Sequence, residues 1–280
     1  MSTKIIELFA FARDKSVDWG EAVDRQHCPY LNRKCIKVRK SRPKISIGTC
    51  TVQYGREDAS VIICPYRLLE RKQVFTDSLH LLTLHEPGNE LHVVTEVTIP
   101  GGSVDYFLVS TKARKVMDFV GVELQTLDTT GTLWPERQRF LQSKEVPVRK
   151  EDVNSDKGFG MNWKMTAKTI LVQLHHKIET FEGINKHLLL VVQDCLLDYM
   201  RKEFNFNHLQ PARLGDPMHI HSYALSAAAT GLRLELQERL STDTAGISAC
   251  LGLQVSPNVE VEQIIKLLES KICDKTLLML

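Results

Sequence analysis

Three strand-like segments, one long amphipathic helix and an apolar strand follow one another along the middle of the chain. The three segments are ELHVVTEVTI, SVDYFLVS and KVMDFVGVELQT, and the turn signal PGG joins the first two. NWKMTAKTILVQLHHKIETFEG then shows helical spacing and ends at Gly183, a residue that caps helices well. KHLLLVVQ reads as a buried strand. This order predicts an α/β core built on a mixed sheet.

Further elements are expected on both sides of this core. Before it, residues 1–24 read as an entry helix and a loop, ISIGTCTVQYG and ASVIICPY as strands, and residues 66–84 as a helix. After it, DCLLDYMRKEF reads as a helix, HIHSYALSA and GLRLELQERLS as a strand pair, and NVEVEQIIKLLESKI as a closing helix.

The chain carries no signal for a membrane or for secretion. No apolar run approaches the ~18 residues that a membrane span needs. The first 21 residues hold too many charges for a secretory signal. We therefore expect a cytoplasmic protein with no membrane partner, in which the thiols stay reduced.

A basic block stands out in a chain whose net charge is only +2. Nine Lys or Arg lie between Arg25 and Arg56, and no Asp or Glu interrupts them. Such a block favours a polyanionic partner, and a solvated loop with a chance charge bias is the alternative. The candidate DNA contacts within it are Arg25, Arg33, Lys34, Lys37, Arg39, Lys40 and Arg42.

Four of the seven cysteines lie in this basic part of the chain, and two of them begin the same tripeptide, CPY. Four thiolates form a complete ligand set for a tetrahedral zinc or single-iron site, which would supply folding energy to a segment with little core. The spacing C-x6-C-x14-C-x13-C differs from that of zinc ribbons, so free thiols and disulfides remain alternatives. The four are Cys28, Cys35, Cys50 and Cys64. The other three, in apolar segments, read as buried core thiols: Cys195, Cys250 and Cys273.

Two acids stand on neighbouring predicted strands. If residues 103–110 and 115–125 pair antiparallel, Asp105 and Glu123 lie near the same sheet edge. Two close carboxylates repel unless a cation separates them, and Mg²⁺ suits oxygen ligands. Such an ion polarises a phosphate and lowers the pKa of a bound water. Taken alone, the pattern favours solvated acids on an edge strand, and a site for Mg²⁺-dependent hydrolysis is the alternative.

A nuclease site of this kind usually has Asp followed by Glu-x-Lys on the next strand. Here Gln125 takes the third position, where it can hold a water by hydrogen bonds but cannot act as a base. This substitution leaves water activation to the metal. Glu96, on the preceding strand, is a further candidate for the acid cluster.

These signals occur together in one known setting. CPYLNRKCIKVRKSRPKISIGTCTVQ…VIICPYR, followed by SVDYFLV and VGVELQT, resembles the NotI-like type II restriction endonucleases. The similarity covers residues ~25–70 and ~88–130 and continues loosely through the long helix and the next strand. The first 20 residues and the region after about 225 show no match. Val104 stands where the family has a proline before its catalytic Asp.

The resemblance implies a restriction-endonuclease-like PD-(D/E)xK core at residues 73–280, with helices flanking a mixed sheet. It also implies a small metal-binding, DNA-contacting domain at residues 1–72. By position, Asp105 and Glu123 would bind catalytic Mg²⁺, and Gln125 would complete the site. The four-cysteine set would hold a structural iron, with zinc as the alternative: Cys28, Cys35, Cys50 and Cys64.

The implied activity is Mg²⁺-dependent hydrolysis of double-stranded DNA at a specific, GC-rich palindrome, giving 5′-phosphate ends. The resemblance further implies a homodimer in a bacterial cytoplasm, with a cognate DNA methyltransferase in the same system. Arginines of the basic block would be the natural guanine readers. Two other classes remain open: a non-catalytic, metal-bearing DNA-binding protein, and a thiol redox sensor.

His219 and His221 lie two residues apart in MHIH, which places both rings on one face of a predicted strand. This spacing suits a metal, but no third ligand stands nearby in the sequence. We therefore interpret the pair as structural.

Overall fold

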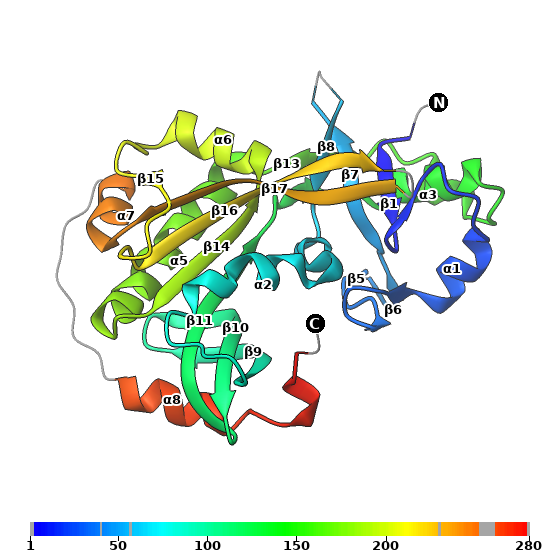
Figure 1. Cartoon of the computed structure of the whole chain (residues 1–280). Helices are drawn as coiled ribbons and strands as arrows, with labels where there is room; N and C mark the ends of the chain where they lie inside the picture. Colours follow the sequence, from blue (N-terminus) through cyan, green and yellow to red (C-terminus); the bar gives the residue numbers. More distant parts are fainter. Residues whose placement is uncertain (1–2, 40, 56–57, 229–230, 252–260, 279–280) are drawn as a thin grey trace. The chain divides into compact units, whose positions relative to one another are not determined.

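The computed structural model describes residues 3–39, 41–55, 58–228, 231–251 and 261–278 (Figure 1). The chain divides into two compact units. The first consists of Met1–Arg71, Thr126–Thr166 and Ala224–Glu235, and the second of Lys72–Gln125, Ala167–Tyr223 and Leu236–Leu280. The expected division into domains at 1–72 and 73–280 stays a prediction.

A seven-stranded mixed sheet, most of whose residues belong to the second unit, confirms the α/β class. Its strand order is β15-β17-β16-β14-β11-β10-β9. The three strands at one edge are antiparallel, and β11, β14 and β16 run parallel. The bounds are β9 Glu90–Ile99, β10 Gly102–Lys112, β11 Lys115–Gln125, β14 His187–Gln193, β15 Gln210–Pro211, β16 Met218–Ala228 and β17 Gly231–Thr242.

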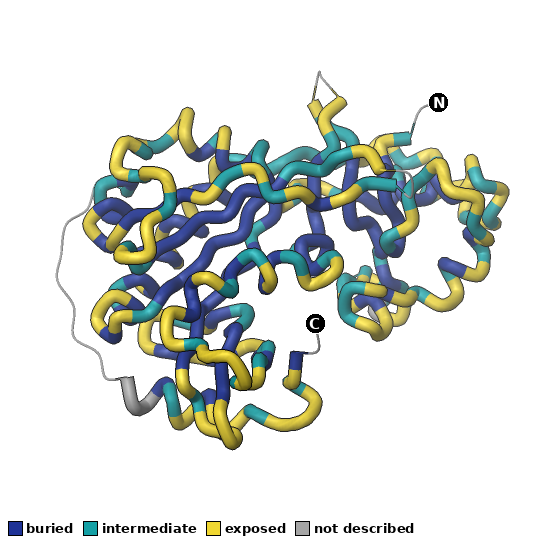
Figure 2. The backbone as a smooth tube through the Cα atoms, in the orientation of Figure 1, coloured by how far each residue is buried: buried dark blue, intermediate teal, exposed yellow. Residues whose placement is uncertain are grey.

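Most predictions for this part of the chain are confirmed. The long helix α5 runs over Trp163–Gly183, and every residue of β14 after it is buried (Figure 2). Helix α5 packs on the sheet through Phe181, whose ring lies 6.0 Å from that of Phe107. Gly121 in β11 makes room for it, since an added Cβ would lie 2.4 Å from the Phe181 ring. The other helices are α6 Asp194–Glu203, α7 Thr244–Leu251 and α8 Val261–Glu269.

The predicted entry helix is wrong. Ile5–Leu8 forms strand β1, whose four residues are all buried, and Phe11–Ala12 forms β2. The two residues between them, Phe9 and Ala10, have φ of 50° and 66°, so they close a two-residue hairpin turn. A helix begins only at Trp19, as α1 Trp19–Arg25.

The first unit has a four-stranded antiparallel sheet in the order β2-β1-β7-β8. The segment expected as one strand, ISIGTCTVQYG, is divided between two strands at Gly48, whose φ is 72°. An added Cβ there would lie 2.3 Å from the Phe9 ring, so only glycine fits. The remaining elements are β3 His27–Cys28, β4 Arg33–Lys34, β5 Val38–Arg39, β6 Arg42–Ser46, β7 Thr49–Tyr54, β8 Ala59–Ile62, β12 Thr129–Gly131, α3 Trp134–Ser143, α4 Lys150–Val153 and β13 Phe159–Met161.

The helix expected over residues 66–84 is broken into three pieces. They are η1 Pro65–Lys72, α2 Gln73–Ser78 and the 3-10 turn η2 Leu79–Leu81. Arg71 and Lys72 both have positive φ, which ends a right-handed helix. The backbone of Glu70 is non-helical, with ψ of 124°. Its side chain accepts hydrogen bonds from Arg67 and from the backbone N–H of Leu234, which stabilise this conformation.

The closing helix is confirmed in part. Helix α8 begins at Val261, and the earlier residues 258–260 of its predicted range lie outside the described ones. Within the described ranges, no helix combines the length and apolarity required to cross a bilayer.

Candidate active site and cysteine pocket

Asp105 and Glu123 face each other across strands β10 and β11. The antiparallel register pairs Tyr106 with Val122, so the next pair along the strands is Asp105 and Glu123. Oδ2 of Asp105 also accepts a hydrogen bond from the backbone N–H of Leu124, at 2.9 Å. The two carboxylates are therefore brought together, as antiparallel pairing of the two predicted strands requires.

Burial makes this pair of acids costly to ionise. Glu123 is only 4% exposed, and burial followed by the nearby Asp105 charge raises its pKa to about 7. Burial also raises the pKa of Asp105, and the charge of Glu96 adds to the effect. A cation beside the carboxylates would offset this repulsion.

Glu96 is the third acid of the cluster. Its neighbours Thr95 and Val97 pair with Tyr106 and Val104, so Glu96 lies opposite Asp105 on the third strand. Its φ of 54° is unusual for a strand residue other than glycine. Three adjacent strands thus each contribute one carboxylate at the same level of the sheet.

A lysine that the sequence interpretation missed completes the cluster. Lys177 of α5 is 5% exposed, and its Nζ lies 2.7 Å from Oε1 of Glu123. It occupies a core-facing position of the helix, between the buried Leu174 and Phe181. The signal in the sequence that could have identified it is a lysine at helical spacing from the apolar residues Leu174 and Phe181. Two other lysines of α5, Lys164 and Lys168, are exposed.

Gln125 lies at the end of β11, two residues beyond Glu123, and is half-buried. Strand alternation places its side chain on the same face as that of Glu123. It pairs in register with Val192 of β14, so the parallel part of the sheet fixes its position.

The four N-terminal cysteines line one small cavity of about 10 Å³, together with Phe9 and Tyr66. All four are buried, and they come from separate places in the first unit, in or beside β3, β4, β7 and β8. A cavity of this size holds about one water-sized sphere. The four residues Cys28, Cys35, Cys50 and Cys64 therefore converge on a space of the size of one ion.

Of these four thiols, Cys64 is the one whose surroundings favour the negative thiolate form. A hydrogen bond with the Cys50 thiol lowers the pKa of Cys64 to about 7, and the charge of Lys37 contributes to the lowering. Burial raises the pKa of the Cys28 and Cys35 thiols, and the hydrogen bond with Cys64 raises that of Cys50.

The donor set thus fits a soft or borderline metal. As the side chains stand, however, the described residues contain no group of three or more His, Cys, Asp or Glu arranged as ligands of one ion. Metal binding by the cysteines and by the acids therefore remains a prediction. Of the three other cysteines, Cys250 is buried and Cys195 half-buried, but Cys273 is exposed, which corrects its interpretation as a core thiol.

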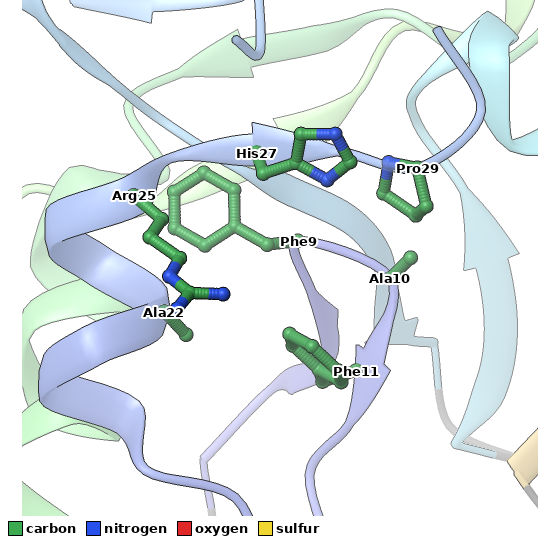
Figure 3. Close-up of a pocket in the computed structure, with 7 residues that line it drawn as sticks. All are labelled: Phe9, Ala10, Phe11, Ala22, Arg25, His27 and Pro29. Carbon is green, nitrogen blue, oxygen red and sulfur yellow. The ribbon is translucent and has the colours of Figure 1, made fainter. Parts of the chain in front are cut away.

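Three of the predicted DNA contacts are well exposed. Arg33 and Lys34 form β4 on the surface, and Arg25 ends α1, where it pairs with Glu21. Arg25 also lines a pocket of about 520 Å³ with Phe9, Phe11 and His27, among others (Figure 3). None of the described residues that line this pocket is acidic, and Arg25 gives it a positive charge.

The other predicted contacts are more enclosed. Lys37 is half-buried and donates to the Ile63 carbonyl at 2.7 Å. The guanidinium of Arg39 lies 4.1 Å from the centre of the Trp134 ring and 3.4 Å from a carboxylate oxygen of Asp152. Arg42 pairs with Arg39 in the ladder between β5 and β6. Lys40 lies outside the described residues.

Comparisons with known proteins add nothing to these observations. No protein-family model matches the chain, and no curated protein matches it either.

Proposed function

We propose that this chain is a type II restriction endonuclease with a PD-(D/E)xK-type core and a four-cysteine metal module. The observation that carries the proposal is the pairing of Asp105 with Glu123 on adjacent strands, two acids that the resemblance to NotI-like enzymes implies, with Lys177 against Glu123. Carboxylates held together at the cost of raised pKa values are typical of functional sites.

The proposed reaction is hydrolysis of a DNA phosphodiester. The oxygen of a water forms a bond to phosphorus, the P–O3′ bond breaks, and the products are a 5′-phosphate and a 3′-hydroxyl. Bound Mg²⁺ would supply Lewis acidity and a more acidic water. Asp105 and Glu123 would hold the ion, and Gln125 would orient the attacking water by hydrogen bonds.

The cysteine module would hold a structural iron or zinc. Four buried thiols around an ion-sized cavity support this part of the proposal. In the same unit, the exposed Arg25, Arg33 and Lys34 would contact DNA. As a homodimer in a bacterial cytoplasm, the enzyme would read a GC-rich palindrome, and a cognate methyltransferase would protect host DNA.

The test is cleavage of a large GC-rich DNA with Mg²⁺, beside Glu123→Ala as the matched control. Discrete fragments from the wild type alone are the expected result, and the fragment ends give the recognition sequence. DNA binding without cleavage by either protein would contradict the proposal. It would instead support a non-catalytic, metal-bearing DNA-binding protein.

A further inference from the structure

We propose that Lys177 supplies the ammonium group that the Glu-x-Gln motif lacks, an inference that rests on the proposed nuclease function. In a Glu-x-Lys motif the ammonium follows the acid on the same strand, but here Gln125 stands at that position. Lys177 reaches the same carboxylate from α5, with its Nζ 2.7 Å from Oε1 of Glu123. The cation therefore comes from the helix that covers the sheet.

Burial of Lys177 is hard to explain by packing alone. Its side chain is 7% exposed and that of Glu123 is 6% exposed, so both charges have lost their water. A buried ion pair contributes little net stability, and apolar residues of similar size often serve a core as well. The neighbouring core positions of α5, Leu174 and Phe181, follow that rule. A lysine at this position indicates a role in the chemistry of the acids beside it.

The turn between β9 and β10 is shaped to admit this lysine. Gly101, with φ of 92°, lies so close to α5 that an added Cβ would stand 2.2 Å from the carbonyl oxygen of His176. At Gly102, with φ of 135°, an added Cβ would stand 3.3 Å from Cε of Lys177. The PGG sequence is thus more than a turn signal, because it lets the helix and the lysine stem approach β10.

The ammonium has a clear task in the proposed reaction. When the water attacks phosphorus, it loses a proton to solvent, O3′ gains one, and negative charge grows on the phosphate oxygens. A positive group fixed beside Glu123 stabilises the hydroxide form of the water and that growing charge.

The test compares Lys177→Met with the transfer variant Lys177→Met/Gln125→Lys. We expect the single variant to cleave about 10²- to 10³-fold more slowly, the usual effect of losing one preorganised group. Its DNA affinity, measured in Ca²⁺, should be unchanged. The transfer variant should cleave at least about tenfold faster than Lys177→Met, because it restores an ammonium beside Glu123.

The chain offers a matched control on the same strand. Lys186 forms an equally short pair with the buried Asp118 of β11, at 2.8 Å. Lys186→Met should lose stability but cleave at the wild-type rate. If Lys177→Met does not fold, Lys177→Gln, which keeps a donor without the charge, takes its place.

The outcomes separate the two proposals. A wild type that cuts while Lys177→Met cuts equally fast would overturn the role of Lys177 and leave the nuclease function standing. The role of Lys177 would also be overturned if the transfer variant recovers nothing, or if Lys186→Met loses as much activity as Lys177→Met. A wild type that cuts no DNA would overturn both proposals.

Discussion

Lys177 and Glu123 form a buried ion pair, with 2.7 Å between Nζ and Oε1, in a cluster that also contains Asp105. The lysine neutralises only part of the negative charge, because the pKa of Glu123 is still raised to about 7. If the site binds Mg²⁺ as proposed, the ion would displace a proton from Glu123 near neutral pH.

Binding of Mg²⁺ should depend on pH as a consequence. Below pH 7 the Glu123 carboxyl is mostly protonated in the folded protein and must release its proton before it can bind the ion. We expect the Mg²⁺ affinity to fall about tenfold per pH unit below 7 and to level off above it. Isothermal titration of Mg²⁺ between about pH 6 and 8 measures this. An affinity that stays constant over the range would contradict the prediction, and Glu123→Gln serves as the control without the titrating group.

Four histidines from distant parts of the chain gather in the second unit. The rings of His80 and His221 lie 5.8 Å apart, and those of His187 and His219 lie 5.2 Å apart. His221 is fully buried, and neither of its ring nitrogens finds a hydrogen-bond partner among the described residues. Burial, with the charges of Arg239, His80 and His219, lowers its pKa to about 3.

This cluster should make the protein sensitive to acid. The folded state keeps His221 neutral, whereas the unfolded chain takes up a proton near pH 6.5, so stability is full above that pH and falls as the pH drops. At about pH 5 His221 alone should cost about 2 kcal/mol. His221→Phe removes this cost and should lose correspondingly less stability between about pH 7.5 and 5 in urea unfolding. Equal losses in both proteins would refute the assignment.

A second buried ion pair tests the structure of the first unit. Arg67 is fully buried and donates to Glu7 at 2.8 Å, to Glu70 at 2.9 Å and to the Leu232 carbonyl at 2.9 Å. Arg67→Met leaves the buried Glu7 carboxylate without its counter-charge, so we expect a loss of about 3–5 kcal/mol in unfolding free energy.

A surface pair provides the comparison for Arg67. Arg201 and Glu238 form a 2.7 Å pair, with more than a third of each side chain exposed. Arg201→Met should therefore cost at most about 1 kcal/mol. Denaturant titration of both variants checks the ranking, which would be wrong if the two losses were alike.

The elements that could be predicted from the sequence are those with a clear local pattern of apolar residues or a clear turn signal. Helix α5 and strand β14 follow from long, regular apolar patterns, and β9 to β11 from alternation and a strong turn signal. The exact pairing of Asp105 with Glu123 depends on the irregularity between Ser110 and Thr111, where the register of β10 and β11 shifts by one residue.

Contacts between distant segments could not be predicted in this way. Lys177 approaches Glu123 only because α5 folds back over the sheet, 54 residues further along the chain. No third histidine stands beside His219 and His221 in the sequence. His187 of the neighbouring strand β14 and His80 of the turn η2 come close to them only in the folded chain. The hairpin at Phe9 and Ala10 was missed because neither residue is typical of positive φ.

The cysteine cavity leads to a prediction about bound metal. Four buried thiols that converge on an ion-sized space should hold about one iron or zinc per chain in protein purified without chelators. Cys64→Ser removes the sulfur with the lowest pKa and should lose the metal and lower the unfolding temperature. Cys250→Ser changes a buried thiol outside the cavity and should keep the metal. Elemental analysis and thermal unfolding of the three proteins measure both effects, and a wild type without metal, or a Cys64→Ser variant that retains it, would rule out the cysteine site.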